Sequence, residues 1–501
     1  MEDRRIIVSC IAIVFLVLVL MPTRMVRAGK YPRLTMTPRT QQQLRKFFKN
    51  HASDMADLLP SQGQQGQGGG SYDDQSEPGS GQQGSKPAGD GSNGGQSRQA
   101  PATNAGMFLY SYQVGTPPQS VSGALDISSE LVWTQCGSCA TCGVTPATPF
   151  YSTLSTTMAV VRCTSDVCQN SAAQNCSADV PGCGYVYMYR GGEANTTGYL
   201  ATESFTFGAT RVDDVVFGCG LDSVGDFGGA SGVIGLGRGP LSLVSQLDAG
   251  RFSYYFAPDG DTDTDTQSFI LFGDDATPQT KRALTTALLA SDDYPNIYLV
   301  GLTGIQVDGK DLGIPRGTFD LRKDGSGGVV LSIAVPVTFL EESAYKLLRQ
   351  ALVSRIRLPT VNGSELGLDL CYASQSLATA KIPGMALVFD GDAVMELEVG
   401  NYFYMDASIG LECLTILPSP YGHVSLLGSL IQAGTHMIYN IHGSTLTFES
   451  LQQASSSPRP PPPSNNSYQG RPGHRLSSAP PPHISLPMLF AHFLWVAVYM
   501  V

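Results

Sequence analysis

Charged side chains are scarce in this chain, and basic ones are the scarcer kind. Only 15% of its 501 residues are charged, and 31 Lys and Arg face 42 Asp and Glu, which gives a formal net charge of −11 at pH 7. Proteins that bind nucleic acid present a basic face to the phosphates, and this composition supplies none. We therefore expect no nucleic-acid partner.

Several familiar catalytic patterns are also missing. No Gly-x-Ser-x-Gly stretch marks a serine nucleophile, the seven histidines are scattered, and no group of His, Asp and Glu has the spacing of a metal site. We expect neither a metal nor a cofactor.

The N-terminus has the layout of a secretory signal. Arg4 and Arg5 precede an apolar run over residues 6–21, and a small-residue cleavage pattern follows at 26–28. We interpret residues 1–28 as a signal peptide. An uncleaved membrane anchor is the alternative, although the apolar run is short for a membrane span.

The C-terminus has the layout of a lipid-attachment signal. Small residues at 477–479 precede a Pro-rich spacer at 480–487 and an apolar run at 488–501, with no Lys or Arg after it. This pattern is typical of a glycosylphosphatidylinositol (GPI) anchor, whose tail at 479–501 is removed, and it is less typical of a permanent transmembrane helix. We expect a secreted protein held to the outer membrane leaflet, at the plasma membrane or in the cell wall. Other permissive attachment residues are Asn466, Ser467 and Gly470.

The cysteines agree with export. Of 11 cysteines, Cys10 lies in the signal peptide, which leaves an even number. Eight fall close together, and three of them could suggest a zinc knuckle, but no histidine lies nearby, so disulfides are favoured in an exported protein. We expect these eight to pair among themselves: Cys136, Cys139, Cys142, Cys163, Cys168, Cys176, Cys183 and Cys219. Four sequons offer glycan sites at Asn175, Asn195, Asn362 and Asn465.

Composition divides the rest of the chain. Residues 29–103 contain a short candidate helix at 41–59 and a Gly/Gln/Ser-rich run at 62–99, which together indicate a propeptide or a flexible stalk. From 107 to 449, short apolar or alternating runs separated by turn residues predict mostly β structure. The predicted helices are 241–247 and 341–354, and residues 453–478 form a Pro/Ser-rich stalk.

One carboxylate draws attention within the β region. The apolar residues 122–125 lead into Asp126, and the apolar pattern resumes at 131–133. A lone carboxylate after a strand is usually a turn residue, so spacing alone does not make it catalytic.

Several motifs do carry a resemblance. They are LYSYQVGTPPQ (109–119), LVWTQC (131–136), SGVIGLGRGPLSL (231–243), YLVGL (298–302) and SLLGS (425–429). Over about residues 107–450 the chain resembles plant aspartic proteases of the nepenthesin type. The resemblance implies a mainly β, bilobal pepsin-like fold, with a first lobe at 104–285 and a second lobe at 286–452. Each lobe would supply one Asp to a dyad on the floor of a cleft.

Here the dyad departs from the family pattern. Asp126 occupies the first catalytic position, but Ile127 and Ser128 replace the usual Thr or Ser and Gly, while Ser332 and Ala334 replace the second Asp and its glycine. The two carboxylates of a working dyad share a proton: one takes a proton from water and the other polarises the scissile carbonyl. We therefore expect hydrolysis to be impaired. Asp324 or Glu341 could substitute for the second Asp only through a rearranged loop.

The resemblance also implies a flap and a disulfide. Tyr189 aligns with the flap tyrosine, although Arg190 and Gly191 replace the Gly and Asp that usually follow it. A packed strand residue is the alternative for Tyr189. In the second lobe, Cys371 and Cys413 occupy positions that the family pairs.

Two functions remain. One is an aspartic-type endopeptidase of extracellular or wall proteins, impaired by Ser332. The other is a non-catalytic binding or inhibitor-like module, as in plant xylanase inhibitors. Either would be a monomer that takes a peptide or protein in its cleft.

Overall fold

A computed structural model describes residues 31–36, 41–52, 55, 108–137, 148–170, 174–176, 180–189, 194–258 and 267–451. The expected signal peptide, Gly/Gln/Ser-rich run, stalk and anchor signal lie outside these ranges, as do Cys139, Cys142 and Asn465. Within the ranges, no helix is both long enough and apolar enough to cross a membrane.

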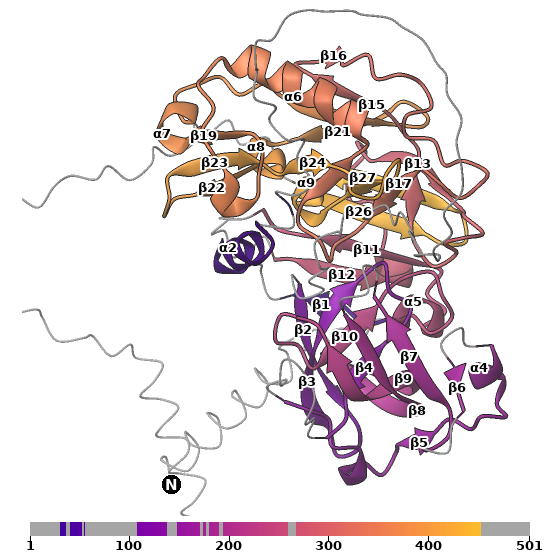
Figure 1. Cartoon of the computed structure of the whole chain (residues 1–501). Helices are drawn as coiled ribbons and strands as arrows, with labels where there is room; N and C mark the ends of the chain where they lie inside the picture. The colour runs from indigo at the N-terminus through magenta and orange to yellow at the C-terminus, as the bar shows by residue number, and fades with distance from the viewer. Residues whose placement is uncertain are drawn as a thin grey trace, which may run out of the picture. The chain divides into compact units, whose positions relative to one another are not determined.

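Short strands dominate the described residues, as their alternating pattern predicts, and they form four sheets (Figure 1). The nine-stranded sheet contains β2 (Leu109–Val114), β3 (Gln119–Asp126), β10 (Gly232–Gly235), β4 (Trp133–Gln135), β9 (Thr210–Val224), β8 (Asn195–Phe207), β7 (Gly184–Met188) and β6 (Gln174–Asn175), with β5 (Ala159–Val160) on β8. The eleven-stranded sheet contains, in spatial order, β1 (Leu34–Thr35), β12 (Phe269–Phe272), β11 (Arg251–Tyr255), β26 (Thr435–Asn440), β27 (Thr445–Ser450), β13 (Leu284–Leu289), β14 (Leu299–Val300), β17 (Val329–Leu331), β25 (Ser425–Leu427), β18 (Thr338–Leu340) and β24 (Ile416–Pro418). The smaller sheets are β16 (Lys310–Asp311), β15 (Leu302–Val307), β20 (Met385–Phe389) and β21 (Ala393–Leu397), and β19 (Cys371–Ala373), β23 (Leu411–Leu414) and β22 (Phe403–Asp406).

Helices are few and mostly short. They are α2 (Gln41–Asn50), α4 (Asp166–Gln169), α5 (Leu243–Gln246), α6 (Glu342–Ile356), α7 (Ser374–Leu377), α8 (Val399–Tyr402) and α9 (Ser429–Gln432), with 3-10 turns η1 (Ser152–Leu154), η2 (Gly273–Asp275) and η3 (Ser364–Leu366). Both helices predicted in the β region are present. Ser242 caps α5 by accepting a hydrogen bond from the Ser245 amide, and the Glu341 carboxylate caps α6.

The two lobes repeat one strand arrangement. In the first lobe β3 runs parallel to β10, with Asp126 opposite Gly235. In the second lobe β17 runs parallel to β25, with Leu331 opposite Leu427. Each lobe therefore delivers the residue at or just after a central strand to the boundary between the lobes.

An aromatic cluster joins the lobes behind that boundary. The ring of Tyr439 lies 4.7 Å from the rings of both Phe252 and Tyr298, centroid to centroid. The Tyr298 hydroxyl donates a 3.0 Å hydrogen bond to the carbonyl of Leu236 in the first lobe. These rings belong to one hydrophobic core that contains buried residues of both lobes. Buried aromatic contacts of this kind contribute strongly to the stability of such a core.

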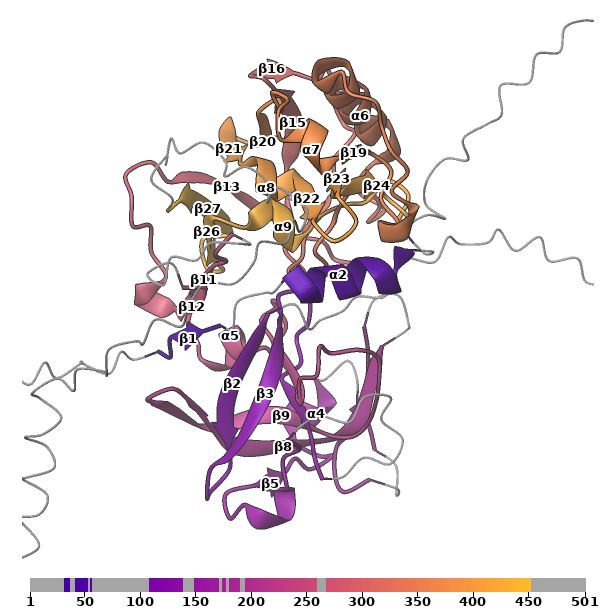
Figure 2. The ribbon, with the colours of Figure 1, turned by 90° about the vertical axis from the view of Figure 1, so that its left-hand side faces the viewer.

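The N-terminal residues do not form a free stalk where they are described. Strand β1 pairs with β12 at the end of the eleven-stranded sheet. Figure 2 shows helix α2 lying across the boundary between the first-lobe strands and the second-lobe elements. The candidate helix at 41–59 thus corresponds to a helix over Gln41–Asn50, and one face of that helix is packed rather than exposed.

Disulfides join cysteines within each lobe. Cys371 and Cys413 face each other across β19 and β23 and form the bond that the resemblance implies. The first-lobe bonds are Cys136–Cys219, Cys163–Cys176 and Cys168–Cys183. All six of these cysteines pair within the expected group of eight.

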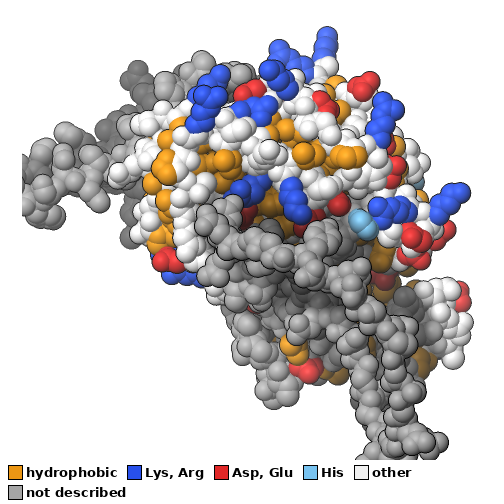
Figure 3. Space-filling view, turned by 45° about the horizontal axis from the view of Figure 1, so that its top comes forward, with side chains coloured by type: hydrophobic (Ala, Val, Ile, Leu, Met, Phe, Trp, Pro, Cys, Tyr) orange, Lys and Arg blue, Asp and Glu red, His pale blue; other side chains and the backbone are white. Residues whose placement is uncertain are grey.

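One face of the second lobe can be followed in Figure 3. Its Lys and Arg side chains are dispersed among uncharged ones, with Asp and Glu between them. In the second lobe, Lys346 Nζ on helix α6 lies 2.8 Å from Glu342 Oε1. This face forms no continuous basic stripe in the part of the chain that the structure describes.

Candidate functional site

A cavity of about 540 Å³ lies between the lobes and receives side chains from both. Such a volume suits several residues of a peptide or a small organic ligand. Its lining comprises Asp126, Ser128, Tyr187, Met188, Tyr189, Asp293, Tyr294, Pro295, Asn296, Ile297, Leu299, Leu321, Gly327, Val330, Ser332, Ala334, Tyr421, Val424 and Leu426. The three residues named from the sequence, Asp126, Tyr189 and Ser332, therefore meet at one site.

Asp126 ends strand β3 and is 3% exposed. Its Oδ1 accepts a 2.8 Å hydrogen bond from the Ser128 amide, and its own carbonyl accepts one of 2.8 Å from the Leu236 amide. Burial raises the pKa of the carboxyl group to about 6, against the lowering effect of the hydrogen bonds from Ser128. Asp126 is therefore a carboxylate that gains a proton in mildly acidic solution.

Ser332 follows strand β17 and is as deeply buried as Asp126. Its amide donates a 3.1 Å hydrogen bond to the carbonyl of Leu427. Two residues further along, Ala334 packs into a hydrophobic cluster made otherwise of first-lobe residues, among them Ala124 and Trp133. The Ser332 loop thus inserts into the opposite lobe, which fixes Ser332 against the floor of the shared cavity.

Gln432, at the end of α9, holds this loop and was not anticipated from the sequence. Its Nε2 donates hydrogen bonds of 3.0 Å to the carbonyls of Ser332, Leu427 and Gly428. Its Oε1 accepts the hydroxyl of Tyr254. No motif around Gln432 signals this role, because its partners come from three separate parts of the chain.

Tyr189 follows strand β7 and is 7% exposed. Its hydroxyl accepts a 2.7 Å hydrogen bond from Nε1 of Trp133, and its ring lies 5.1 Å from the ring of Tyr187 and 5.5 Å from that of Phe227. Tyr189 is therefore both a packed residue and a wall of the cavity. Arg190 and Gly191 lie outside the described residues.

The opposite wall comes from the segment that enters the second lobe. Tyr294, Pro295 and Ile297 line the cavity there, and Asp293 lies at its exposed rim. Sequence reasoning missed this wall because a polar connecting segment carries no periodic signal.

Neither carboxylate considered as a replacement reaches the cavity lining. Asp324 is exposed, and its Oδ1 accepts hydrogen bonds from the amide and hydroxyl of Ser326. Glu341 is occupied in capping α6, where it accepts from the amides of Ser343 and Ala344. Among the described lining residues, Asp126 is thus the one buried carboxylate.

A metal has little to bind in the described residues. The one close group of potential ligands is Cys163, Cys168 and Cys176. All three form disulfides, which removes the thiolates that a metal would need.

The expected glycan sites fall in different settings. Asn195 begins strand β8 and is half-buried, whereas Asn362 is exposed and its Oδ1 accepts a 2.9 Å hydrogen bond from the Ser364 amide. Asn175 lies in strand β6.

Two β-rich lobes that deliver their central strands to one cavity define the pepsin-like aspartic protease class. The sequence models named Xylanase inhibitor N-terminal and Xylanase inhibitor C-terminal match residues 108–274 and 297–450. Among characterised relatives, aspartic proteinase nepenthesin-2 of Nepenthes gracilis is 35% identical over 353 residues, covering 70% of this chain and 79% of the relative. Aspartic proteinase nepenthesin-1 of the same species is 36% identical over 355 residues, with the same coverage. This chain belongs to the pepsin-like aspartic protease family, among the nepenthesin-type plant members.

Solved structures support the same fold. Conglutin gamma, a basic 7S globulin from lupine seeds, aligns with a TM-score of 0.54 at 20% identity, over 69% of this chain and 92% of that one. Basic 7S globulin from soybean aligns with a TM-score of 0.55 at 19% identity, over 71% and 96%.

Proposed function

We propose that this protein is a secreted member of the aspartic endopeptidase family whose cavity binds a peptide segment but cleaves it slowly or not at all. The observation that carries this proposal is that Asp126 and Ser332 line the same cavity. Residues of both lobes form the rest of its lining.

The chemistry of the two side chains supports impairment. Peptide hydrolysis by this family needs one carboxylate to take a proton from water and a second, protonated one to polarise the scissile carbonyl. Asp126 can fill one of these roles at a time. The Ser332 hydroxyl can hold a water but cannot carry the shared proton, because an alcohol does not titrate near neutral or acidic pH. Losing one of two cooperating groups reduces turnover by orders of magnitude.

Binding does not require the second carboxylate. Tyr187, Tyr189, Tyr294 and Tyr421 surround the cavity with aromatic surface, which favours ligands that bring apolar or aromatic side chains. The two deep polar groups, Asp126 and Ser332, then orient the ligand backbone.

A second candidate is a non-catalytic, inhibitor-like module that binds another protein. The match to sequence models described as xylanase inhibitor domains favours it, and a secreted glycoside hydrolase would then be the partner. In both cases we propose export through the signal peptide, attachment to the membrane through the C-terminal signal, and a monomer.

The test compares ligand binding and turnover in matched variants. The chain, secreted from a eukaryotic host, is assayed for cleavage of a peptide library between pH 3 and 7 and for binding of a peptide inhibitor that mimics the tetrahedral intermediate. We expect no measurable cleavage by the natural sequence, and inhibitor binding at least about tenfold tighter in Ser332→Asp, because such inhibitors report dyad complementarity. The double variant Asp126→Ala, Ser332→Asp should lose this gain.

Two other outcomes would redirect the assignment. Cleavage by the natural sequence as fast as that by Ser332→Asp, and lost in Asp126→Ala, would establish a one-carboxylate protease and overturn the proposed impairment. Tight inhibition of a xylanase, unchanged in Asp126→Ala, would favour the inhibitor-like module instead.

A further inference from the structure

The described residues at 31–36, 41–52 and 55 are built into the fold. Strand β1 pairs antiparallel with β12, with Leu34 opposite Ile270. The Met36 amide extends this ladder with a 3.0 Å hydrogen bond to the carbonyl of Ser268. The Arg33 guanidinium lies 5.2 Å above the ring of Phe269. Backbone and side chains thus both attach this segment to the eleven-stranded sheet.

Helix α2 buries one complete face. Leu44, Phe47 and Phe48 recur at helical spacing and are at most 2% exposed, as is Met55 beyond the helix. The ring of Phe48 lies 4.7 Å from that of Tyr404 in the second lobe. These side chains are anchors of the kind that hold a helix in a hydrophobic groove.

The segment lies so close to one glycine of the second lobe, Gly367, that no side chain would fit there. At Gly367 a Cβ atom would lie 2.6 Å from the Ala52 carbonyl oxygen and 2.9 Å from the Met55 Cβ. The residue also has a φ of +64°, which favours glycine. The groove therefore fits the chain at Ala52 and Met55 closely enough that a side chain at this position is excluded.

Charge pairs connect the helix to both lobes. Arg45 Nε lies 3.2 Å from Asp406 Oδ2 in the second lobe, and Lys46 Nζ lies 3.1 Å from Asp226 Oδ2 in the first. The segment 31–55 carries five basic residues and one acidic residue, within a chain whose net charge is −11. Helix α2 is thus a basic bridge between two acidic partners that belong to different lobes (Figure 2).

The segment leaves the candidate site accessible. Among its described residues, none lines the cavity that contains Asp126 and Ser332. Its contacts include β12, β22 and η3, the loop of Asp226, and the carbonyl of Asp248, which accepts a 3.4 Å hydrogen bond from the Tyr31 hydroxyl.

We propose that residues 31–55 are a clamp that fastens the two lobes together and that remains bound when the chain between residues 56 and 107 is cut. The buried face of α2 and the β1 ladder supply the affinity, and the pairs with Asp226 and Asp406 set its position across the lobes. Maturation of this protein would then yield two associated chains rather than a released propeptide. This inference does not rest on the proposed function, because it concerns a different surface.

The experiment introduces a specific protease site within residues 62–99 of the secreted chain. After cleavage, gel filtration in native buffer at about pH 7 followed by mass spectrometry should find the N-terminal fragment with the core, and denaturant should release it. Separation of the fragment from a folded core in native buffer would overturn the proposal.

Matched variants test the anchors. In the cut protein, Phe47→Ser with Phe48→Ser should increase fragment release at least about tenfold, because each change removes a buried aromatic anchor. Lys49→Ser, on the exposed face of the same helix, should leave it unchanged. A synthetic 31–55 peptide should also raise the melting temperature of the stripped core, and the double-serine peptide should not. Equal release from the two variants would contradict the assigned contacts.

Discussion

At the residue scale, Asp126 is deeply buried, and its hydrogen bonds offset only part of the cost of burying its charge. The carboxyl group is 3% exposed and accepts a hydrogen bond from the Ser128 amide. Burial raises its pKa from 3.8 to about 6, so the ionised form is less stable in the folded protein than in the unfolded chain. One pKa unit corresponds to about 1.4 kcal/mol, so ionised Asp126 costs the fold about 3 kcal/mol.

The variant Asp126→Asn should therefore be more stable than the natural protein at neutral pH. Asparagine keeps the oxygen that accepts from the Ser128 amide but carries no charge. The cost of ionisation is absent below the unfolded pKa of 3.8 and complete above the folded pKa of about 6. We expect the variant to gain about 2 to 3 kcal/mol in free energy of unfolding at pH 8 and little at pH 3.5. Urea unfolding at the two pH values measures this, and an equal gain at both would refute it.

Gln432 makes a second prediction at this scale. In Gln432→Met, the carbonyls of Ser332, Leu427 and Gly428 lose their side-chain donor, which should cost about 2 to 4 kcal/mol. The Ser332 loop should also lose its position, so the tighter inhibitor binding expected in Ser332→Asp should fall in the double variant.

The matched control is Gln246→Met. Gln246 makes similar bonds to Val216 and Leu241, away from the cavity lining. This change should lower stability and leave inhibitor binding intact. If both variants weaken binding equally, Gln432 has no special positioning role.

At the scale of elements, the sequence predicted where helices form, which depends on neighbouring residues, but not where they dock, which depends on distant ones. The starts of α5 and α6 lie within two residues of the predicted ones, and in the structure Ser242 and Glu341 cap them through neighbouring amides. Helix α2 was expected as well. Its docking was not, because Phe48 meets Tyr404 across hundreds of residues of chain and no local pattern encodes that contact.

The candidate site divides in the same way. The resemblance placed Asp126, Tyr189 and Ser332, and all three line the cavity. Gln432 escaped prediction because its partners converge only in the folded chain. The wall at 293–297 escaped it because a connecting segment has no periodicity.

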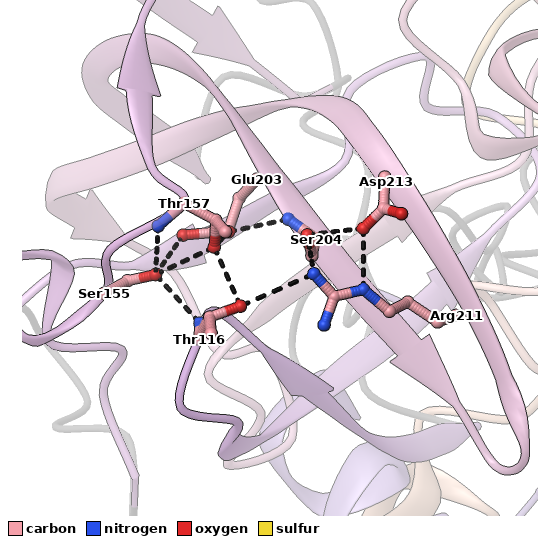
Figure 4. Close-up of polar contacts among 7 residues, drawn as sticks. All are labelled: Thr116, Ser155, Thr157, Glu203, Ser204, Arg211 and Asp213. Carbon is pink, nitrogen blue, oxygen red and sulfur yellow. Dashed lines mark hydrogen bonds and ion pairs between the residues drawn. The ribbon is translucent and has the colours of Figure 1, made fainter.

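A polar network in the first lobe connects strand β8 to the segment 155–157, which follows η1 (Figure 4). Glu203 on β8 is 1% exposed and accepts hydrogen bonds from the Ser155 hydroxyl at 2.6 Å, from the Ser204 amide at 2.7 Å and from the Thr157 hydroxyl. One buried carboxylate thus satisfies three donors. Two of these donors belong to the segment 155–157, so Glu203 holds that segment against the nine-stranded sheet.

Glu203→Ala should make the segment 155–157 more mobile. The three donors would lose their acceptor, at a cost of about 2 to 4 kcal/mol. Amide hydrogen exchange should speed up at Thr156, whose amide bonds to the Thr116 carbonyl, and remain slow at buried Val233 in β10. The exposed Glu365→Ala is the control. Uniform acceleration over the whole lobe would contradict a local role.

At the scale of the whole molecule, the eleven-stranded sheet couples the lobes. Strand β26 lies between β11 and β27, and its aromatic residue Tyr439 contacts the rings of both Phe252 and Tyr298. Opening these strands would expose the core that the lobes share. Trp133, in the first lobe, should therefore report by fluorescence the same unfolding transition that circular dichroism reports for the whole chain.

A buried pair in this sheet should set the stability of the whole molecule against acid. His436 and Glu449 face each other across β26 and β27, with 2.9 Å between Nδ1 and Oε1. Burial lowers the pKa of His436, outweighing the hydrogen bond and charge of Glu449, which raise it. Burial raises the pKa of Glu449, but the amides of Gln279 and Thr280 and the His436 bond outweigh it, so the net shift is downward.

Both shifts have the same sign for stability. A histidine whose pKa is lowered by folding destabilises the fold as pH falls below its unfolded value of 6.5, and a lowered glutamate pKa does so as pH falls below 4.5. We expect the melting temperature to fall between pH 7 and pH 4, despite the opposite contribution of Asp126. His436→Gln keeps a donor for Glu449 without titrating in this range, so its melting temperature should fall less steeply. Glu449→Gln should cost about 3 kcal/mol at pH 7, where three donors lose a charged acceptor, and less at pH 4. A steeper acid loss in His436→Gln than in the natural protein would show that another group controls the transition.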